Sequence, residues 1–376
     1  MLGGVDNFPD ELRPYISDTD TGLGITFGPT ISGWILSMSG WRYIFIVHAV
    51  ALFIVLICSY SMPSDSKKDG HKKLDIMGIT LFIISLLCLM LAITQGAQIG
   101  WLATGTILLF ISGLILMGLF AFVEHHTQNP MVNVDLVCNK RFLGMILIPV
   151  VASLAFVTLL TYFPSYLMAV KGISPLHAGL VMITLTSPVL FLPIIAGKLV
   201  AKGVSPEILL KISLLLLVAG LALLWFTSSH TVGITITMSC LFLVGAGMGL
   251  SAGLVDGIAL SIVDEQEVGR AAGILNTFRL GSEALAVAIY GSLLASGILQ
   301  AFKSDDKILD IAKTRQFISQ IISGNVVNNT NSSYYAGITE IYQQSFESTL
   351  LVLMIISLIV SIMIIRLIRK DKHTQL

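Results

Sequence analysis

Charge is scarce in this chain of 376 residues. Asp, Glu, Lys and Arg make up 12% of it, about half the share found in soluble globular domains. The 22 basic and 22 acidic side chains leave no net charge, which argues against nucleic acid or an acidic substrate as a partner. A hydrophobic share of 55%, arranged in long uncharged runs, is typical of a protein that crosses a membrane several times.

The sequence also lacks the motifs of common enzyme classes. It contains no P-loop, no H-E-x-x-H pair and no nucleophile elbow. Its four cysteines, Cys58, Cys88, Cys138 and Cys240, have no metal-ligand spacing, and three of them lie in apolar runs. Residues 1–21 are polar and acidic, which does not fit a cleavable signal peptide. We therefore expect no enzyme activity, no metal and no bound cofactor.

Ten segments are long and apolar enough, or nearly so, to cross about 30 Å of hydrocarbon. Each should be a helix, because lipid cannot satisfy free backbone N–H and C=O groups. The sequence thus predicts an all-α polytopic membrane protein with about ten transmembrane helices. The predicted spans are residues 22–37, 43–62, 76–95, 103–123, 143–169, 177–200, 207–226, 233–260, 276–299 and 347–367.

Basic residues set the orientation of such a chain, because short cytoplasmic loops carry an excess of Lys and Arg. One set of short loops and ends carries fifteen of them: Lys67, Lys68, Lys72, Lys73, Lys140, Arg141, Lys198, Lys202, Lys211, Arg270, Arg279, Arg366, Arg369, Lys370 and Lys372. The opposite short loops carry only Arg42 and Lys171. We therefore predict that both termini are cytoplasmic.

The first predicted span contains an unusual glycine and proline pattern. Its sequence is Gly22-Leu-Gly-Ile-Thr-Phe-Gly-Pro-Thr-Ile-Ser-Gly33. Gly24, Gly28 and Ser32 recur every four residues, which predicts a smooth helix face that another helix can approach closely. Pro29 removes a backbone donor and predicts a kink beside that face. Ordinary packing between small residues is the alternative interpretation.

With Gly33 and the following Trp41-Arg-Tyr-Ile-Phe45, this pattern resembles the antiporter signature in the fifth helix of major facilitator superfamily drug exporters. The stretches Phe163-Pro-Ser-Tyr-Leu167, Gly172-Ile-Ser-Pro-Leu-His-Ala-Gly179 and Gly269-Arg-Ala-Ala-Gly-Ile-Leu-Asn-Thr-Phe-Arg279 resemble the fourteen-span drug:proton antiporters of that superfamily. Multidrug, quaternary-ammonium and lincomycin-resistance exporters belong to this group.

The resemblance implies a partial major-facilitator fold that lacks spans one to four. Its implied parts are a polar cytoplasmic leader (1–21), the last two helices of the N-terminal bundle (22–62), two linker helices (76–123), a C-terminal six-helix bundle (143–367) with an external loop (300–346), and a cytoplasmic tail (368–376). We expect a truncated copy, which the upstream nucleotide sequence would test.

Ionisable residues inside spans are costly and point to function. Asp256 lies near the cytoplasmic end of its predicted span, and in one continuous helix it would share the face of Gly249. Glu283 lies two turns into the next span, on the face of Asn276, where a carboxyl group could exchange a proton as the access state changes. Alternatively, Asp256 meets cytoplasmic water, and Arg279 pairs with Glu283 one turn away.

Aromatic residues beside Pro164 form a candidate cavity. Tyr162, Phe163 and Tyr166 could offer ring faces to a lipophilic or cationic drug, or could simply face lipid at the interface. The resemblance implies proton-coupled export of lipophilic or cationic drugs across the plasma membrane, energised by the proton gradient. Small lipophilic substrates, protons and membrane lipid are the implied partners. The alternative is a remnant that transports nothing, or a membrane interaction partner.

Overall fold

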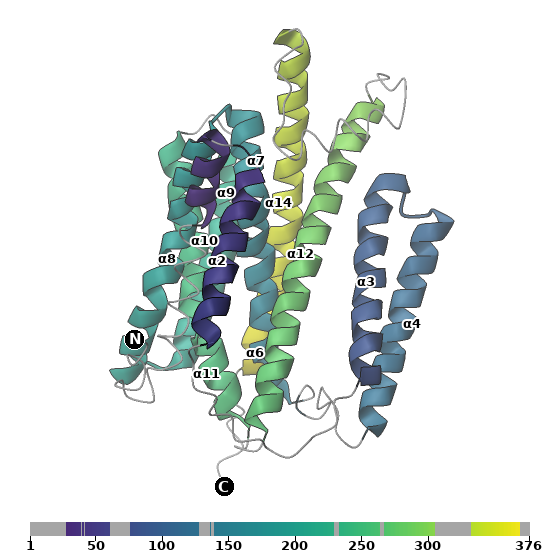
Figure 1. The fold of residues 1–376 in the computed structure, drawn as a ribbon, viewed down its shortest axis with the longest axis vertical. Helices are drawn as coiled ribbons and strands as arrows, with labels where there is room; N and C mark the ends of the chain where they lie inside the picture. Colours follow the sequence, from purple (N-terminus) through teal and green to yellow (C-terminus); the bar gives the residue numbers. More distant parts are fainter. Residues whose placement is uncertain are drawn as a thin grey trace.

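The computed structural model describes residues 28–38, 40, 42–60, 76–127, 136, 139–228, 233–263, 267–304 and 332–368. Within these residues every regular element is a helix (Figure 1). The labelled helices are α2 (Arg42–Tyr60), α3 (Ile76–Ile99), α4 (Thr104–His126), α6 (Lys140–Ala152), η2 (Ser153–Val157), α7 (Thr158–Lys171), α8 (Pro175–Ala201), α9 (Pro206–Ser228), α10 (Ile234–Ser251), α11 (Leu254–Ser261), α12 (Val268–Ser304) and α14 (Ser332–Ile368). Residues 28–38 form a further helix, which we call the motif helix.

Eight helical segments of the described chain are long and apolar enough to cross a membrane, which confirms the all-α polytopic fold class. They coincide with the last eight of the ten predicted spans. The predicted span at 43–62 coincides with α2, which is 19 residues long. The predicted span at 22–37 overlaps the motif helix, and residues 22–27 lie outside the described residues.

Both ends of the predicted external loop at 300–346 are helical in the structure. Helix α12 continues to Ser304 and α14 begins at Ser332, while residues 305–331 lie outside the described residues. Glutamate and glutamine side chains lower the hydropathy of the first turns of α14, so the sequence pattern hides them. The helix forms there nevertheless because Tyr342 and Phe346, one turn apart, are both buried against the bundle.

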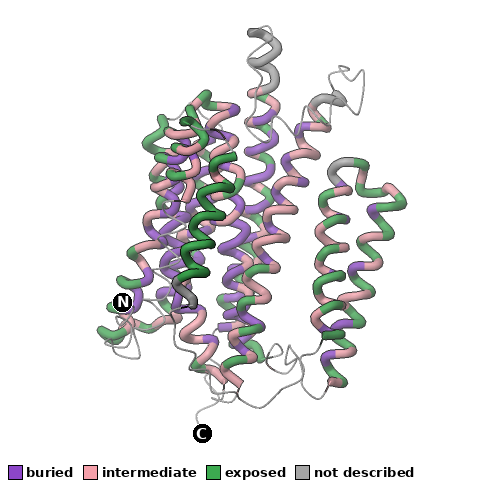
Figure 2. The backbone as a smooth tube through the Cα atoms, viewed as in Figure 1, coloured by how far each residue is buried: buried purple, intermediate pink, exposed green. Residues whose placement is uncertain are grey.

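The core lies in the bundle formed by α6 to α12 and α14, and Figure 2 shows most of the buried backbone there. In the most apolar window of Lys140–Lys171, 72% of the residues are buried, against 17% in α3 and in α4. The α3–α4 hairpin packs on this bundle through α12, where the Ser292 hydroxyl donates to the carbonyl of Ile93 over 3.0 Å (Figure 1).

Local signals place the ends of several helices. The Asn139 side chain accepts the backbone N–H groups of Arg141 and Phe142 and so begins α6. Gly172 ends α7 in the left-handed conformation, with φ of 65°. Ser174 then caps α8, which starts at Pro175.

Glycines let α10 pack tightly between α8 and α9. A Cβ atom on Gly249 would lie 2.6 Å from the carbonyl oxygen of Pro188 on α8. A Cβ on Gly247 would lie 2.6 Å from the Leu217 side chain on α9, and a Cβ on Gly245 would overlap the carbonyl oxygen of Leu185. Backbones come this close only where a side chain is missing, so the three glycines hold the three helices together.

Candidate functional site

The motif helix packs against the first turns of α8. The Thr30 hydroxyl donates to the carbonyl of Gly179 over 3.1 Å. A Cβ on Gly33 would lie 2.6 Å from the carbonyl oxygen of Pro175, and a Cβ on Gly179 would lie 2.8 Å from that of Pro29. The two segments that carry part of the family resemblance therefore meet each other.

The smooth face predicted for the motif helix is not the face in contact. A Cβ on Gly28 would meet nothing within 4 Å, and Gly24 lies outside the described residues. The close approach is made at Gly33, one residue beyond the four-residue repeat. Spacing within one helix predicts which residues share a face, but it does not predict which neighbouring helix that face contacts.

This geometry gives the first prediction. Gly33→Ala should loosen the contact with α8, because backbone atoms must move to admit the new methyl group, at a cost of about 1–3 kcal/mol. We expect hydrogen exchange at the backbone amides of residues 176–179 to become roughly tenfold faster. Gly28→Ala is the matched control and should leave these amides unchanged. Equal exchange in both variants would contradict the contact.

Helix α10 does not run on to Asp256. It ends at Ser251, and Ala252 and Gly253 break the helix, with Gly253 at φ of 70°. The predicted continuous helix, on which Asp256 shares the face of Gly249, is therefore wrong. Helical periodicity does not continue through a residue with positive φ, so the axis of α11 differs in direction from that of α10.

The new direction brings Asp256 to α12. The Arg279 guanidinium donates to the Asp256 carboxylate over 2.6 Å, and the two side chains are 31% and 26% exposed. The alternative in which Arg279 pairs with Glu283 is not the arrangement observed. Arg279 instead bridges two helices, and the pair ties the short helix α11 to the first half of α12.

Glu283 lies one turn beyond Arg279 on α12. It is half-buried and forms no hydrogen bond or ion pair with the described residues. Its neighbour Ser282 is buried and bonds to Ser153 on the π-helical segment η2, with 3.0 Å between the hydroxyl oxygens. The predicted neighbour Asn276 is exposed. Single π-helical turns recur at functional sites, and this one lies beside an ionisable group within a span.

The three predicted aromatic residues belong to a larger cluster. Tyr162 stacks on Tyr290 of α12 with ring centroids 4.5 Å apart, and Tyr166 stacks on Phe346 of α14 at 4.1 Å. Phe163 lies 5.9 Å from the same Phe346 ring. Sequence reasoning missed Tyr290, Tyr342 and Phe346. The only signal was their helical spacing: Tyr290 lies seven residues after Glu283, and Tyr342 four before Phe346.

A cavity of about 220 Å³ lies at the end of the bundle where α7 and α9 end and α10 begins. Phe163, Tyr166, Lys171, Thr227 and Ser228 are among its lining residues, whereas Tyr162 is not. Pockets for drug-sized ligands measure about 300–1,000 Å³. In this conformation the cavity is smaller than a typical drug pocket, so the role of these aromatic residues in drug binding stays a prediction.

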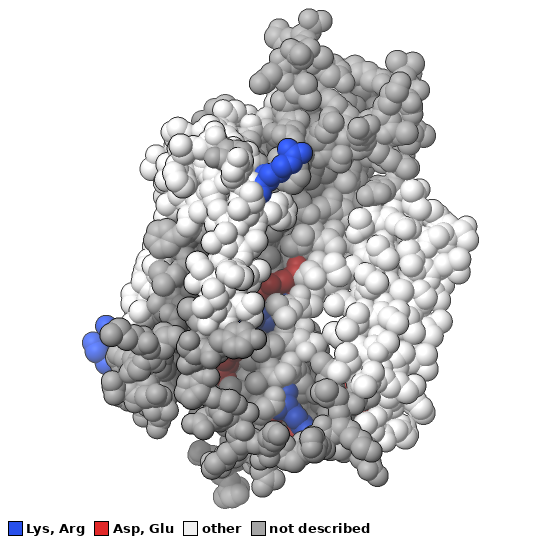
Figure 3. Space-filling model, viewed as in Figure 1, with Lys and Arg blue, Asp and Glu red and all other residues white. Residues whose placement is uncertain are grey.

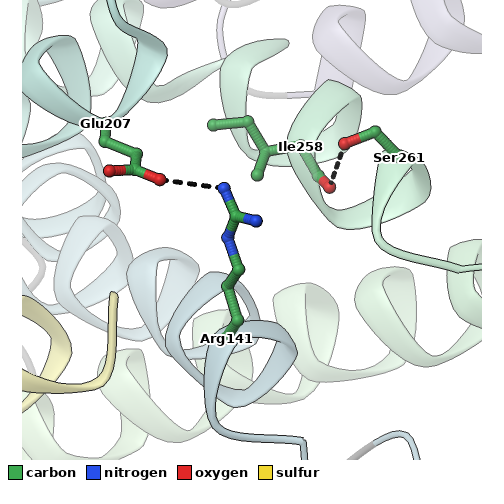
Figure 4. A network of polar contacts seen from close by, with 4 residues as sticks. All are labelled: Arg141, Glu207, Ile258 and Ser261. Atoms are coloured by element: carbon green, nitrogen blue, oxygen red, sulfur yellow. Dashed lines mark hydrogen bonds and ion pairs between the residues drawn. The ribbon is translucent and has the colours of Figure 1, made fainter. Parts of the chain in front are cut away.

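A second ion pair, at the opposite end of the bundle, was also missed. Arg141 at the start of α6 donates to Glu207 of α9 over 2.8 Å, beside Ile258 and Ser261 of α11 (Figure 4). No sequence pattern links two residues 66 positions apart. The guanidinium side chain is 47% exposed, so this pair contributes little to stability.

Charged side chains are few on the face drawn in Figure 3, where broad surfaces of the described residues carry none. Acidic atoms are visible at mid-height between two such surfaces, with basic atoms just below them. The described residues contain no group of three or more His, Cys, Asp or Glu that could hold a metal ion.

The apolar helices and the polar groups within them define a multi-pass α-helical membrane protein. Comparison with known sequences identifies its family. The model of the Major Facilitator Superfamily matches residues 20–287, and the chain belongs to that family.

Its relatives include transporters from several bacteria. The multidrug resistance protein Stp of Mycobacterium tuberculosis is 26% identical over 73% of this chain and 50% of its own length. The multidrug transporter protein MdtP of Bacillus subtilis is 28% identical over 61% of this chain and 42% of its own. The riboflavin transporter RibZ of Clostridioides difficile is 27% identical over 80% of this chain and 65% of its own length. The chain spans about half the length of the first two.

Proposed function

We propose that the chain exports lipophilic or cationic small molecules across the plasma membrane in exchange for protons. Its family, and the multidrug transporters among its relatives, support the class of substrate. The observation that carries proton coupling is the position of Arg279 between two carboxylates: it forms an ion pair with Asp256 and interacts electrostatically with Glu283.

The exchange of one cation between two acids would couple protonation to shape. A proton on Asp256 removes the negative charge that binds Arg279. The nearest carboxylate is then Glu283, which lies one turn from Arg279 on α12. Protonation of Glu283 favours the return of Arg279 to Asp256. In each state, therefore, one of the two carboxyl groups carries a proton and the other forms the ion pair with Arg279.

The break at Gly253 would convert this exchange into movement. Helix α11 is only eight residues long, and Gly253, which has a positive φ, directly precedes it. The ion pair between Asp256 and Arg279 is one of the few polar contacts between α11 and other helices among the described residues. Release of Arg279 therefore frees α11 to tilt against α6 and α12, with which it packs.

Basic residues support an orientation with cytoplasmic termini. Among the described residues, Arg141, Lys202, Lys211 and Arg270 lie at or near the helix ends on one side of the bundle, where α8 ends and α6, α9 and α12 begin. The opposite ends carry Lys171 and, at the start of α2, Arg42. The side richer in Lys and Arg is the cytoplasmic one by the positive-inside rule.

Expression in a drug-sensitive bacterial host tests the function. Cells that make the full chain should tolerate higher concentrations of lipophilic cations and expel a fluorescent cationic dye faster than cells with an empty vector. A protonophore should abolish the difference. No difference from the empty vector would reject export and favour a membrane protein that transports nothing, whereas efflux that survives the protonophore would reject proton coupling.

Glu283→Gln gives the second prediction. The amide cannot take up or release the proton, so proton-driven dye efflux should fall by about a hundredfold. The isosteric change should leave the thermal midpoint of the purified protein nearly unchanged. Glu340→Gln, at an exposed position on α14, is the matched control and should transport normally. Normal proton-driven efflux in Glu283→Gln would remove this residue from the mechanism.

A further inference from the structure

Three tyrosine hydroxyls are buried in the bundle without a partner. The side chains of Tyr166, Tyr290 and Tyr342 are 2%, 0% and 1% exposed, and none of the three hydroxyl groups forms a hydrogen bond with the described residues. Buried polar groups nearly always find a partner in protein or water, and an unpaired one costs about as much as a lost hydrogen bond. Three such groups from α7, α12 and α14 in one cluster therefore call for a shared explanation.

The rings of the three tyrosines lie near one another. The Tyr166 and Tyr342 ring centroids are 6.1 Å apart, and the Phe346 ring, 4.1 Å from Tyr166, lies 6.3 Å from Tyr290. Tyr290 interacts electrostatically with Tyr342, Tyr162 and Tyr166. We call Tyr162, Tyr166, Tyr290 and Tyr342 the tyrosine cluster.

One end of the tyrosine cluster lies at the cavity. Tyr166 lines the 220 Å³ cavity together with Lys171 and Ser228. The Gln343 side chain donates to the Ser228 carbonyl over 2.8 Å and to the Glu347 carboxylate over 3.0 Å. The Glu347 carboxylate in turn acts on Tyr166 electrostatically. Water can therefore reach Tyr166 through this cavity, whose largely apolar lining includes the polar side chains of Lys171, Thr227 and Ser228.

The other end of the cluster approaches Glu283. The Tyr162 hydroxyl donates to the carbonyl of Val287 over 3.1 Å, and Val287 lies one helical turn beyond Glu283 on α12. Tyr290 lies seven residues beyond Glu283, on the same face and about 10 Å along the axis. The cluster therefore extends from the cavity toward Glu283.

We propose that water molecules bridge the hydroxyls of the tyrosine cluster and that this path carries protons between the cavity, at the external end, and Glu283. Each hydroxyl accepts a proton on its oxygen and releases its own to the next water, so each tyrosine is unchanged after the step. At the end of the path the Glu283 carboxylate becomes a carboxylic acid. The path deepens the proposed exchange mechanism, on which it rests, by naming the route by which its proton arrives.

Hydroxyl-radical footprinting of the purified full chain tests whether the cluster holds water. Radicals produced by X-rays label side chains that lie beside bound water even when they are buried. Tyr166, Tyr290 and Tyr342 should be oxidised several times faster than Phe142 and Phe156, which are equally buried, do not line the cavity and serve as internal controls. Equal oxidation of all five would show a dry cluster and overturn the proposal.

Infrared spectroscopy on reconstituted protein tests proton conduction without requiring export. The carboxylic-acid band that is absent in Glu283→Gln should appear after the external solution is acidified. In the variant Tyr166→Phe/Tyr290→Phe/Tyr342→Phe, this band should appear at least about tenfold more slowly. Tyr43→Phe, on the exposed helix α2, should leave the rate unchanged. An unchanged rate in the triple variant would overturn the path even if the cluster holds water.

The two proposals can fail separately. Absence of drug export by the wild-type chain would reject the proposed function, while the footprinting and infrared results would still decide whether the path exists. Normal export with a dry tyrosine cluster would retain the function and reject the path.

Discussion

Gly245→Ala is expected to give little folded protein. The new Cβ atom would overlap the carbonyl oxygen of Leu185, so α8 and α10 must separate at the centre of their contact. Overpacking a tight interior costs about 1–3 kcal/mol and occasionally more, a large part of a total stability of about 5–15 kcal/mol. The measurement is the thermal midpoint and the folded yield of the detergent-purified protein, by size-exclusion chromatography after heating.

Gly281→Ala is the control for this variant. It lies within α12, where a Cβ atom would meet nothing within 4 Å. Because alanine favours a helix over glycine by about 1 kcal/mol, the midpoint should stay or rise slightly. If Gly245→Ala were as stable as Gly281→Ala, the close approach of α8 and α10 would not exist in the folded protein.

Arg279→Ala is expected to have the largest effect on transport. It removes the cation that the proposed exchange moves between Asp256 and Glu283, so proton-driven efflux should fall by about a hundredfold or more. Stability should fall by only about 1–2 kcal/mol, since both partners of the observed pair keep partial contact with solvent. Efflux in proteoliposomes and the thermal midpoint, measured on one preparation, separate the two effects.

Two further variants show whether Arg279 acts through its pair. Asp256→Asn should release the guanidinium and hold the protein in the state in which Arg279 meets Glu283, so efflux should be lost although the fold remains. Glu207→Gln breaks the exposed pair with Arg141 and should cost less than about 1 kcal/mol and little transport. Equal loss of transport in both variants would contradict a special role for Asp256.

Hydropathy predicted the helices well because lipid leaves the backbone so few alternatives. The eight spans from residue 76 onward are all helical, and their lengths follow from the thickness of the hydrocarbon core. The same measure misplaced the start of α14. Its first turns gain stability from buried aromatic contacts with α7, and a hydropathy average over neighbouring residues cannot detect contacts with a distant helix.

The candidate site was predicted in part. Asp256, Arg279 and Glu283 attracted attention because charge inside a span is expensive, and the structure brings all three to one region. Their partnership could not be predicted, because it depends on the break at Gly253. In the sequence, Gly245, Gly249 and Gly253 form one regular series, yet the first two pack on α8 and the third ends the regular helix.

Contacts between remote segments were the least predictable feature. Gly28 and Gly33 both belong to the family signature, and only the position of α8 distinguishes them. The tyrosine cluster likewise assembles residues from three helices that are up to 180 positions apart, from Tyr162 to Tyr342. Spacing within one helix predicts which residues share a face, but not what that face meets.

Dye transport by the purified full chain in proteoliposomes tests the central claim of proton-coupled export most directly. With an imposed pH gradient as the only energy source, the wild-type chain should move a fluorescent lipophilic cation against its concentration gradient, and Glu283→Gln should not. Dye movement that is the same with and without the pH gradient, or the same as in liposomes without protein, would contradict the claim.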